Sequence, residues 1–286
     1  MAMNMNHALY RRRRQANAVG MVTSMLAMAL GLSVLLWILV VLFTNGFAAL
    51  DWNIFTQDTP APGTDGGGLR NAIVGSLLIV GLSVLVATPV GILAGIYLTE
   101  YGDQSKTAEL TRFVTDIMLS APSIVIGLFV YAIAVATLGG FSGYAGSLAL
   151  ALIAVPVVMR TTENMLRLVP SSLREAAFAL GAPRWKVSLS VTLRAAKSGV
   201  ITGVLLAIAR ISGETAPLLF TALSNQFYSD DMSKPMANLP VVIFQFAMSP
   251  YDNWVNLAWG GALLITLSVL GLNILARTFF REKSPV

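Results

Sequence analysis

Long stretches without acidic or basic residues constrain this chain more than any other feature of its sequence. An α-helix needs about 20 apolar residues to cross the hydrocarbon core of a bilayer. Five stretches are at least that long, namely residues 15–50, 71–99, 117–159, 198–223 and 255–276. All are free of Asp, Glu, Lys and Arg except 198–223, which contains Arg210 and Glu214. Only 12% of the residues are charged, against about 25% in an average soluble protein, so the sequence predicts an integral membrane protein.

The stretch 117–159 is too long for one helix, and glycines interrupt it within 138–146. Because glycine clusters favour tight turns, we predict two helices here, over residues 112–138 and 143–159. The first stretch has its apolar centre at 19–43, which is longer than the roughly 7–15 apolar residues of a signal peptide, so we predict that it is retained. The sequence therefore predicts an all-α membrane protein with six transmembrane helices.

Basic residues are grouped between the predicted spans, and this grouping predicts the orientation. They lie in the amino-terminal tail, between spans four and five, and at the carboxyl terminus: Arg11 to Arg14, then Arg160, Arg167, Arg174, Arg184, Lys186, Arg194 and Lys197, then Arg277, Arg281 and Lys283. By the positive-inside rule these segments, and with them both termini, are expected to be cytoplasmic. The net charge of +5 then reflects membrane orientation and does not indicate a nucleic-acid partner.

This orientation gives a simple domain organisation. We predict a cytoplasmic basic tail over residues 1–17 and a single transmembrane domain over 18–286, which includes a cytoplasmic segment at 160–197. The segment 100–116 fits least well, because its four acidic residues outnumber its two basic ones. Acidic residues contribute little to the rule, so a cytoplasmic position remains compatible.

Several kinds of catalytic site are absent from the sequence. The chain has no cysteine, and His7 is its single histidine, so we predict no metal site and no cofactor on this chain. It also lacks the G-x-x-x-x-G-K-[ST] pattern of a phosphate-binding loop. We therefore predict that it is not an enzyme and does not itself hydrolyse ATP.

The predicted cytoplasmic segment contains a short helix with clear end signals. Ser172 followed by Glu175 has the spacing of a capping box, and Gly181 with Pro183 favours termination of the helix. A second helix is expected from about Trp185 into span five. These residues alone are equally compatible with a helical hairpin that lies on the membrane surface.

The pattern of this helix resembles the EAA loop of ABC-importer permeases. Glu175, Ala176 and Ala177 are followed after three residues by Gly181, and after nine more by Val191 and Leu193. Val191 stands where the family pattern has Ile, and Arg194 where it has Pro, which affects the exit of the loop. The resemblance implies the type I importer permease fold, and it implies that this helix sits in a groove of a separate ATP-binding subunit.

Arg210 and Glu214 are the charges inside the fifth stretch. An arginine at the bilayer centre costs about 2.5–3.5 kcal/mol on insertion scales, and residues four apart on a helix share a face and can pair. We expect this face to be turned toward the bundle interior or a water-filled path. The pair either fixes helix packing, or Arg210 lowers the barrier for a translocated anion while Glu214 holds it. Arg160, the first charge after span four, either lines the inner exit or anchors the helix at the membrane surface.

The stretch 205–223 resembles PstA-type permeases of phosphate-specific ABC importers, as do residues 174–186 and 121–131. This resemblance implies phosphate as the substrate and a bacterial inner-membrane location. It also implies a second, PstC-like permease subunit, two ATP-binding subunits that use ATP and magnesium, and an external phosphate-binding protein. The residues alone leave three alternatives open: another oxyanion such as sulfate or molybdate, a homodimer, and a secondary anion transporter coupled to protons.

Overall fold

The computed structural model describes residues 7–102 and 105–279, and within them all regular secondary structure is helical. The chain begins with a long helix, α1, and continues through a short α2 into α3, whose last turn, η1, is π-helical. The bounds up to the seventh helix are α1 His7–Ala49, α2 Asn53–Thr56, α3 Arg70–Ile96, η1 Tyr97–Tyr101, α4 Lys106–Ser120, α5 Ser123–Val130, η2 Tyr131–Val135, α6 Ala136–Leu138 and α7 Gly143–Arg167. The remaining elements are α8 Ser171–Ala179, α9 Arg184–Lys186, η3 Val187–Thr192, α10 Leu193–Ala195, α11 Lys197–Ser212, α12 Ala216–Leu219, α13 Leu239–Ala247 and α14 Asp252–Phe279.

Four helices are long and apolar enough to cross a membrane, and two bent pairs bring the total to six if each pair counts as one span. The continuous spans are Leu9–Ala49, Arg70–Tyr101, Gly143–Arg167 and Asp252–Leu275. The all-α membrane fold is therefore confirmed, with four to six spans. Residues 7–17 of the predicted tail belong to α1, whereas residues 1–6 and the charges at 281–283 lie outside the described residues.

The predicted third span is not one helix. Lys106–Ser120 and Ser123–Val135 meet at 107°, because Ala121 and Pro122 are extended, with ψ of 137° and 134°. Proline has no backbone N–H to donate, and it also disfavours helical geometry in the residue before it.

The predicted fifth span is also wrong in its extent. Its helix α11 ends at Ser212 rather than near 223, and the helix expected to run into it from Trp185 bends by 74° at Ala196.

The turn before the predicted fourth span lies within residues 138–146, as the glycines there predicted. Gly139 has a φ of +85°, and the side chain of Ser142 accepts a hydrogen bond from the Ala145 amide at the start of α7.

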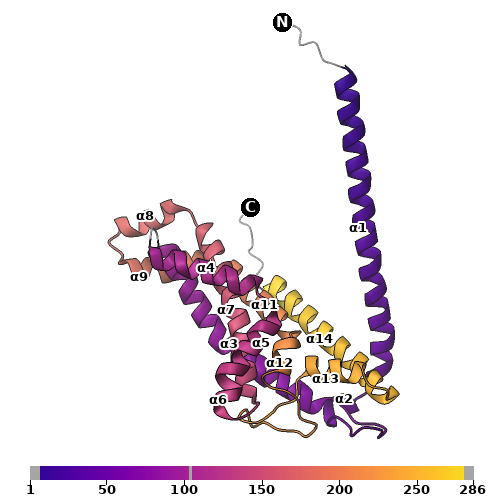
Figure 1. The fold of residues 1–286 in the computed structure, drawn as a ribbon. Coiled ribbons are helices and arrows are strands. Elements are labelled where there is room, and N and C mark those ends of the chain that lie inside the picture. The colour runs from indigo at the N-terminus through magenta and orange to yellow at the C-terminus, as the bar shows by residue number, and fades with distance from the viewer. Residues whose placement is uncertain (1–6, 103–104, 280–286) are drawn as a thin grey trace.

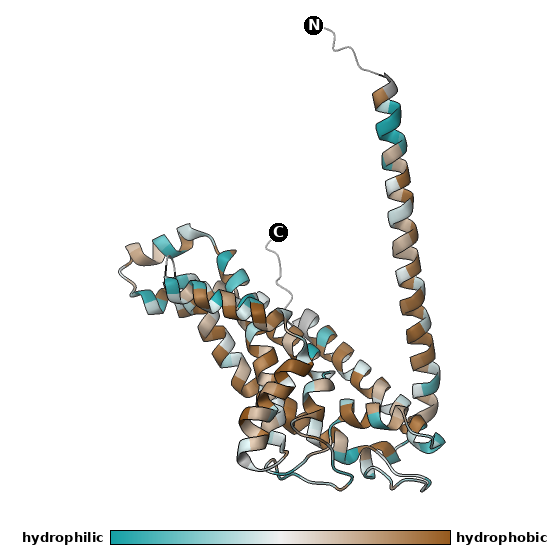
Figure 2. Ribbon diagram, viewed as in Figure 1, coloured by the Kyte–Doolittle hydropathy of each residue, from teal (hydrophilic) through white to brown (hydrophobic). Residues whose placement is uncertain are grey.

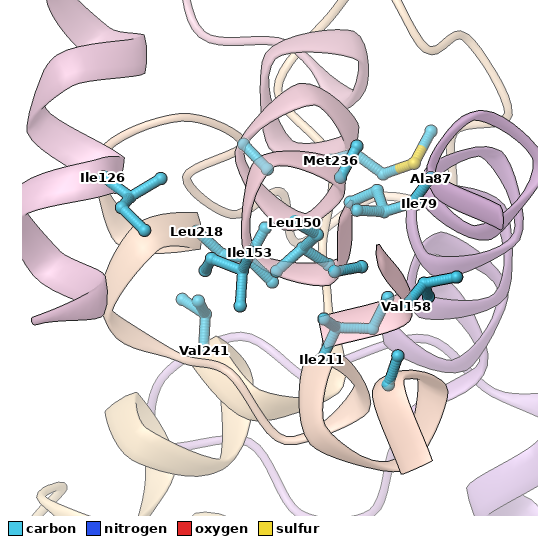
Figure 3. Close-up of a cluster of buried hydrophobic side chains, with 14 residues drawn as sticks. Ile79, Ala87, Ile126, Leu150, Ile153, Val158, Ile211, Leu218, Met236 and Val241 are labelled. Carbon is cyan, nitrogen blue, oxygen red and sulfur yellow. The ribbon is translucent and has the colours of Figure 1, made fainter. Parts of the chain in front are cut away.

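The core lies where α3, α7 and α11 pack together (Figure 3). Figure 3 shows Leu150 and Ile153 at the centre of a cluster that Ile79 and Ile211 complete from the neighbouring helices. Small residues let the backbones approach, as is usual between membrane helices. A side chain at Gly95 would lie 2.7 Å from Thr162 Cβ of α7.

Helix α1 stands apart from this bundle and approaches it only near its own end, beside α14 (Figure 1). Its most apolar window has no buried residue, and most of the helix is hydrophobic apart from hydrophilic turns toward its ends (Figure 2). Gly46 marks the contact, since a side chain there would lie 2.7 Å from Leu263 Cβ.

The bundle has two distinct ends (Figure 1). Helices α8 and α9 project at one of them, which we call the α8 end, and the first turns of α1 and the direction of α14 point to the same side. The opposite end carries α2, α6 and α13. Helix α13 was not predicted from the sequence. It begins at Leu239, with Pro240 in its first turn, and the Asn238 side chain accepts a hydrogen bond from the Val241 amide at 3.1 Å.

We predict that Gly95→Leu destabilises the α3–α7 contact. Overpacking of a close contact costs about 1–3 kcal/mol, so thermal unfolding of the purified protein in detergent should shift down by several degrees. Gly81→Leu on the same helix is the matched control, because nothing lies within 4 Å of that position. Equal melting temperatures for the two variants would contradict the packing described here.

Candidate functional site

Arg210 and Glu214 lie on the two sides of a helix end. Arg210 occupies the last turn of α11, and Glu214 follows Gly213 beyond that end. The expected single helix face is therefore not present, because the Gly213 amide donates to the Arg210 carbonyl at 3.3 Å and closes the helix. The two side chains nevertheless approach, with 3.8 Å between Arg210 Nε and Glu214 Oε1. Within the described residues this contact is the one ion pair of Arg210, so most of its donors remain available.

Arg210 is turned away from the core of its own chain. Thr202, Leu206 and Arg210 are exposed at intervals of four residues along α11, whereas the opposite face, with Ala207 and Ile211, is buried. The Arg210 side chain is 43% exposed. An arginine within a membrane-spanning stretch does not face lipid without a large cost, so an exposed Arg210 favours a water-filled path or a second subunit beside this face.

Arg160 lies inside α7 rather than after it, because that helix continues to Arg167. Its guanidinium is 3.5 Å from Asp116 Oδ1 of α4 and 3.4 Å from Glu163 Oε2. Both distances are at the long end of an ion pair. Arg160 is thus close to two carboxylates and bound tightly to neither.

Glu163 is a buried carboxylate whose structural role was not predicted from the sequence. Its side chain is 1% exposed, and Oε1 accepts from Arg112 Nε at 2.8 Å and from Arg167 Nη2 at 2.6 Å. A second nitrogen of Arg112 donates to the Leu98 carbonyl at 2.8 Å. Glu163 therefore links α7 to α4, and Arg112 extends the cluster to Leu98 near the start of η1. The spacing of Glu163 and Arg167 along one helix face is a signal that predicts part of this cluster once α7 is extended past residue 159.

Helix α8 contains the EAA-like residues. It begins at Ser171, and no side chain caps its first turn, so the predicted capping box of Ser172 and Glu175 is wrong. Its end is as predicted. Gly181 has a φ of +77°, and the Gly181 and Ala182 amides donate to the carbonyls of Phe178 and Ala177, which is the Schellman arrangement.

The surface of α8 is open. The helix has no buried residue, and it projects with α9 at the α8 end of the bundle (Figure 1). Glu175 and Ala176 are exposed, whereas Ala177 is half-buried. Large apolar side chains are exposed around the turn at Gly181, namely Leu173, Phe178, Leu180 and Trp185, with Leu180 at 89%. Exposed apolar groups of this kind mark a contact with another protein or with a membrane surface.

We predict that Glu163→Ala lowers the free energy of unfolding by about 2 kcal/mol, because Arg112 and Arg167 lose a charged hydrogen-bond acceptor. Chemical or thermal unfolding in detergent measures this change. Glu109→Ala, an exposed acidic residue of α4, is the control and should stay within about 0.5 kcal/mol. A Glu163→Ala protein as stable as this control would show that the cluster contributes nothing to the fold.

Comparisons with known proteins agree with this architecture. Residues 87–282 match the family model for the binding-protein-dependent transport system inner membrane component. The phosphate transport system permease protein PstA of Yersinia pestis is 60% identical over 95% of this chain and 92% of its own length. The PstA protein of Haemophilus influenzae is 57% identical over 99% of this chain and 100% of its own length.

Solved structures share the fold at low sequence identity. A chain of the MetNI methionine ABC transporter in an inward-facing conformation has a TM-score of 0.63 at 17% identity, covering 73% of this chain and 93% of that one. A chain of a bacterial alginate ABC transporter also has a TM-score of 0.63, at 14% identity, covering 90% of this chain and 94% of that one. The protein therefore belongs to the family of binding-protein-dependent transport system inner membrane components and, within it, to the PstA-type permeases.

Proposed function

We propose that this chain is the permease subunit of an ATP-driven phosphate importer in the bacterial inner membrane and forms half of the translocation path. Relatives with 57–60% identity are phosphate transport system permeases. The observation that carries the site assignment is Arg210, a membrane-embedded arginine that faces away from its own bundle and has one loose ion pair.

The chemistry of Arg210 suits a phosphate ion. Guanidinium presents several donors in a fixed plane that match the oxygens of phosphate. The 3.8 Å contact with Glu214 is weak enough for an entering anion to replace the carboxylate as partner. Glu214 also favours phosphate over sulfate, because an ionised carboxylate only accepts hydrogen bonds, and phosphate near neutral pH retains a proton to donate. We assign Arg160 to the same path, on the side of the α8 end.

Other subunits complete the path and supply the energy. A second, PstC-like permease covers the exposed face of α11, two ATP-binding subunits bind ATP and magnesium, and an external phosphate-binding protein delivers the substrate. Both termini are cytoplasmic in this proposal, so that residues 1–17 form the basic tail, 18–286 the permease domain and 160–197 its coupling segment. The exposed contact surface of α8 supports this orientation, because a soluble ATPase subunit must reach it.

The transport cycle follows from these assignments. ATP binding closes the ATPase pair, whose groove holds the helix with Glu175, Ala176, Ala177 and Gly181 at its end. The movement of α8 opens the path outward, the binding protein releases phosphate, and hydrolysis resets the permease. A secondary transporter would need no surface like that of α8, and transport would then follow the proton gradient instead of ATP.

We predict that Arg210→Gln lowers phosphate uptake by at least about tenfold. This factor corresponds to the free energy of one lost hydrogen bond to a charged group. Uptake of labelled phosphate is measured in a bacterial strain that lacks its own PstA-type permease, with the amount of protein in the membrane quantified. Lys106→Gln, at an exposed basic residue of α4, is the control and should leave uptake unchanged. Full ATP-dependent uptake by Arg210→Gln would remove Arg210 from the path, and competition by unlabelled sulfate or molybdate would reassign the substrate.

We predict that Ala176→Trp prevents docking of the ATP-binding subunits, because a large side chain on the exposed face of α8 blocks close approach. Co-purification of the ATPase with the permease measures this effect. Ala195→Trp adds the same bulk at an exposed position of α10 and should retain the ATPase. If the Ala176→Trp protein also retains it, α8 is not the docking element.

A further inference from the structure

Arg174 attaches helix α8 to the membrane bundle, in addition to the contact between α8 and η3. No residue of α8 is buried. Arg174 on this helix donates from Nε and Nη2 to Glu100 Oε1, at 3.1 and 3.0 Å. It also donates to the carbonyls of Val169 and Leu166, at 2.6 and 2.8 Å. The side chains of Arg174 and Glu100 are 19% and 7% exposed, so the pair is largely shielded from water and weakly screened.

A second arginine, on the helix that follows the turn at Gly181, also contacts Glu100. Arg184 at the start of α9 donates from Nη2 to the backbone carbonyl of Glu100. Its guanidinium also lies over the ring of Tyr101, 4.9 Å from the ring centroid. The helices before and after the turn are therefore both attached to residues 100 and 101.

Glu100 lies on η1, which continues α3 without a break. A π-helical turn of this kind often occurs at functional sites. Along its length α3 is packed against α7 through Gly91 and Gly95. At its far end Arg70 forms two hydrogen bonds of 3.0 Å with Asp58. One continuous helical segment thus runs from the anchor of α8 to the opposite end of the bundle.

The chain also connects α8 to α7 through residues 168–170, and the Leu166 carbonyl of α7 accepts a hydrogen bond from Arg174. The connection from the end of α8 into the membrane is less direct. It passes through α9, η3 and α10 and then bends by 74° before α11. A bend at Ala196 can absorb a displacement of α8 by changing its angle. The attachment to α3 contains no such bend, because the Glu100 carboxylate accepts hydrogen bonds directly from Arg174.

We propose that Glu100 is a positioning residue for transport, through which a movement of α8 displaces α3. The inference rests on the proposed function, in which an ATPase moves α8. Glu100 binds neither substrate nor nucleotide. It makes α8 and the adjoining end of α3 move as one body, so that ATPase closure is converted into a change of the translocation path.

Glu100→Gln separates this role from a contribution to stability. The amide keeps the shape of the side chain but removes the charge that pairs with Arg174, and Arg174 retains its two carbonyl acceptors. The importer is reconstituted in proteoliposomes with both permease chains, the ATP-binding subunits and phosphate-loaded binding protein. Phosphate uptake and ATP hydrolysis are then measured together. We expect uptake per ATP hydrolysed to fall at least about tenfold, which is a typical size for lost coupling between sites.

Glu109→Gln, at an exposed carboxylate of α4, is the matched control and should transport as the wild type does. An unchanged ratio of uptake to hydrolysis for Glu100→Gln overturns the inference. If the wild-type complex shows no ATP-driven phosphate uptake, the proposed function itself fails, and the two failures are thereby distinguished.

A second measurement applies even if Glu100→Gln does not assemble. The wild-type sequence has no cysteine, so spin labels can be placed at Ser172→Cys on α8 and Leu93→Cys on α3, both exposed positions. The distance between the labels is measured in the complex without nucleotide and with ATP trapped. We expect a change within about 2 Å, the size of a small helix shift, and a change above about 5 Å, one helical turn, would contradict rigid attachment.

Discussion

Charge in a low-dielectric environment is the constraint on which the rest of this structure depends. A charged group inside the bilayer must be paired, hydrated or hidden from lipid, because its desolvation is costly. The charged residues of this chain meet this requirement in two ways. Glu100 and Glu163 are buried with arginines from distant segments, whereas Arg210 remains exposed on the outer face of its own bundle. The first arrangement stabilises a fixed structure, and the second leaves an arginine available to another molecule.

Ion pairs also account for part of the acidic excess in the segment 100–116. Its acidic excess conflicts with a simple distribution of positive charge, yet Glu100 binds Arg174 and Asp116 approaches Arg160. Two of the four acidic residues of this segment thus lie beside basic residues from α7 and α8. Together the segments 100–116 and 160–197 form one polar region at the α8 end, and the exposed apolar side chains of α8 lie on this region.

The sequence predicts the helices better than their bends. Apolar length located every membrane segment, and glycines located the turn before α7 and the end of α8, because these signals are local. The break at Ala121 and Pro122 has a local signal in the proline, although apolar length alone does not reveal it. The bend at Ala196 has none, since alanine and its neighbours are compatible with a continuous helix. The pairs Arg112–Glu163 and Glu100–Arg174 join residues 51 and 74 positions apart, and one sequence does not show which charges meet across such a separation. The Arg210–Glu214 approach was expected from spacing, but it is achieved across a helix end rather than along a face.

The central claim is that phosphate passes Arg210 at the interface between two permease chains. A cryo-electron microscopy structure of the complete importer, trapped with phosphate in the path, tests it most directly. We predict a phosphate oxygen about 3 Å from the Arg210 guanidinium, with Glu214 moved from its present contact and a second permease chain facing α11. A phosphate bound elsewhere in the path, with Arg210 still paired to Glu214 or covered by lipid, would contradict the claim.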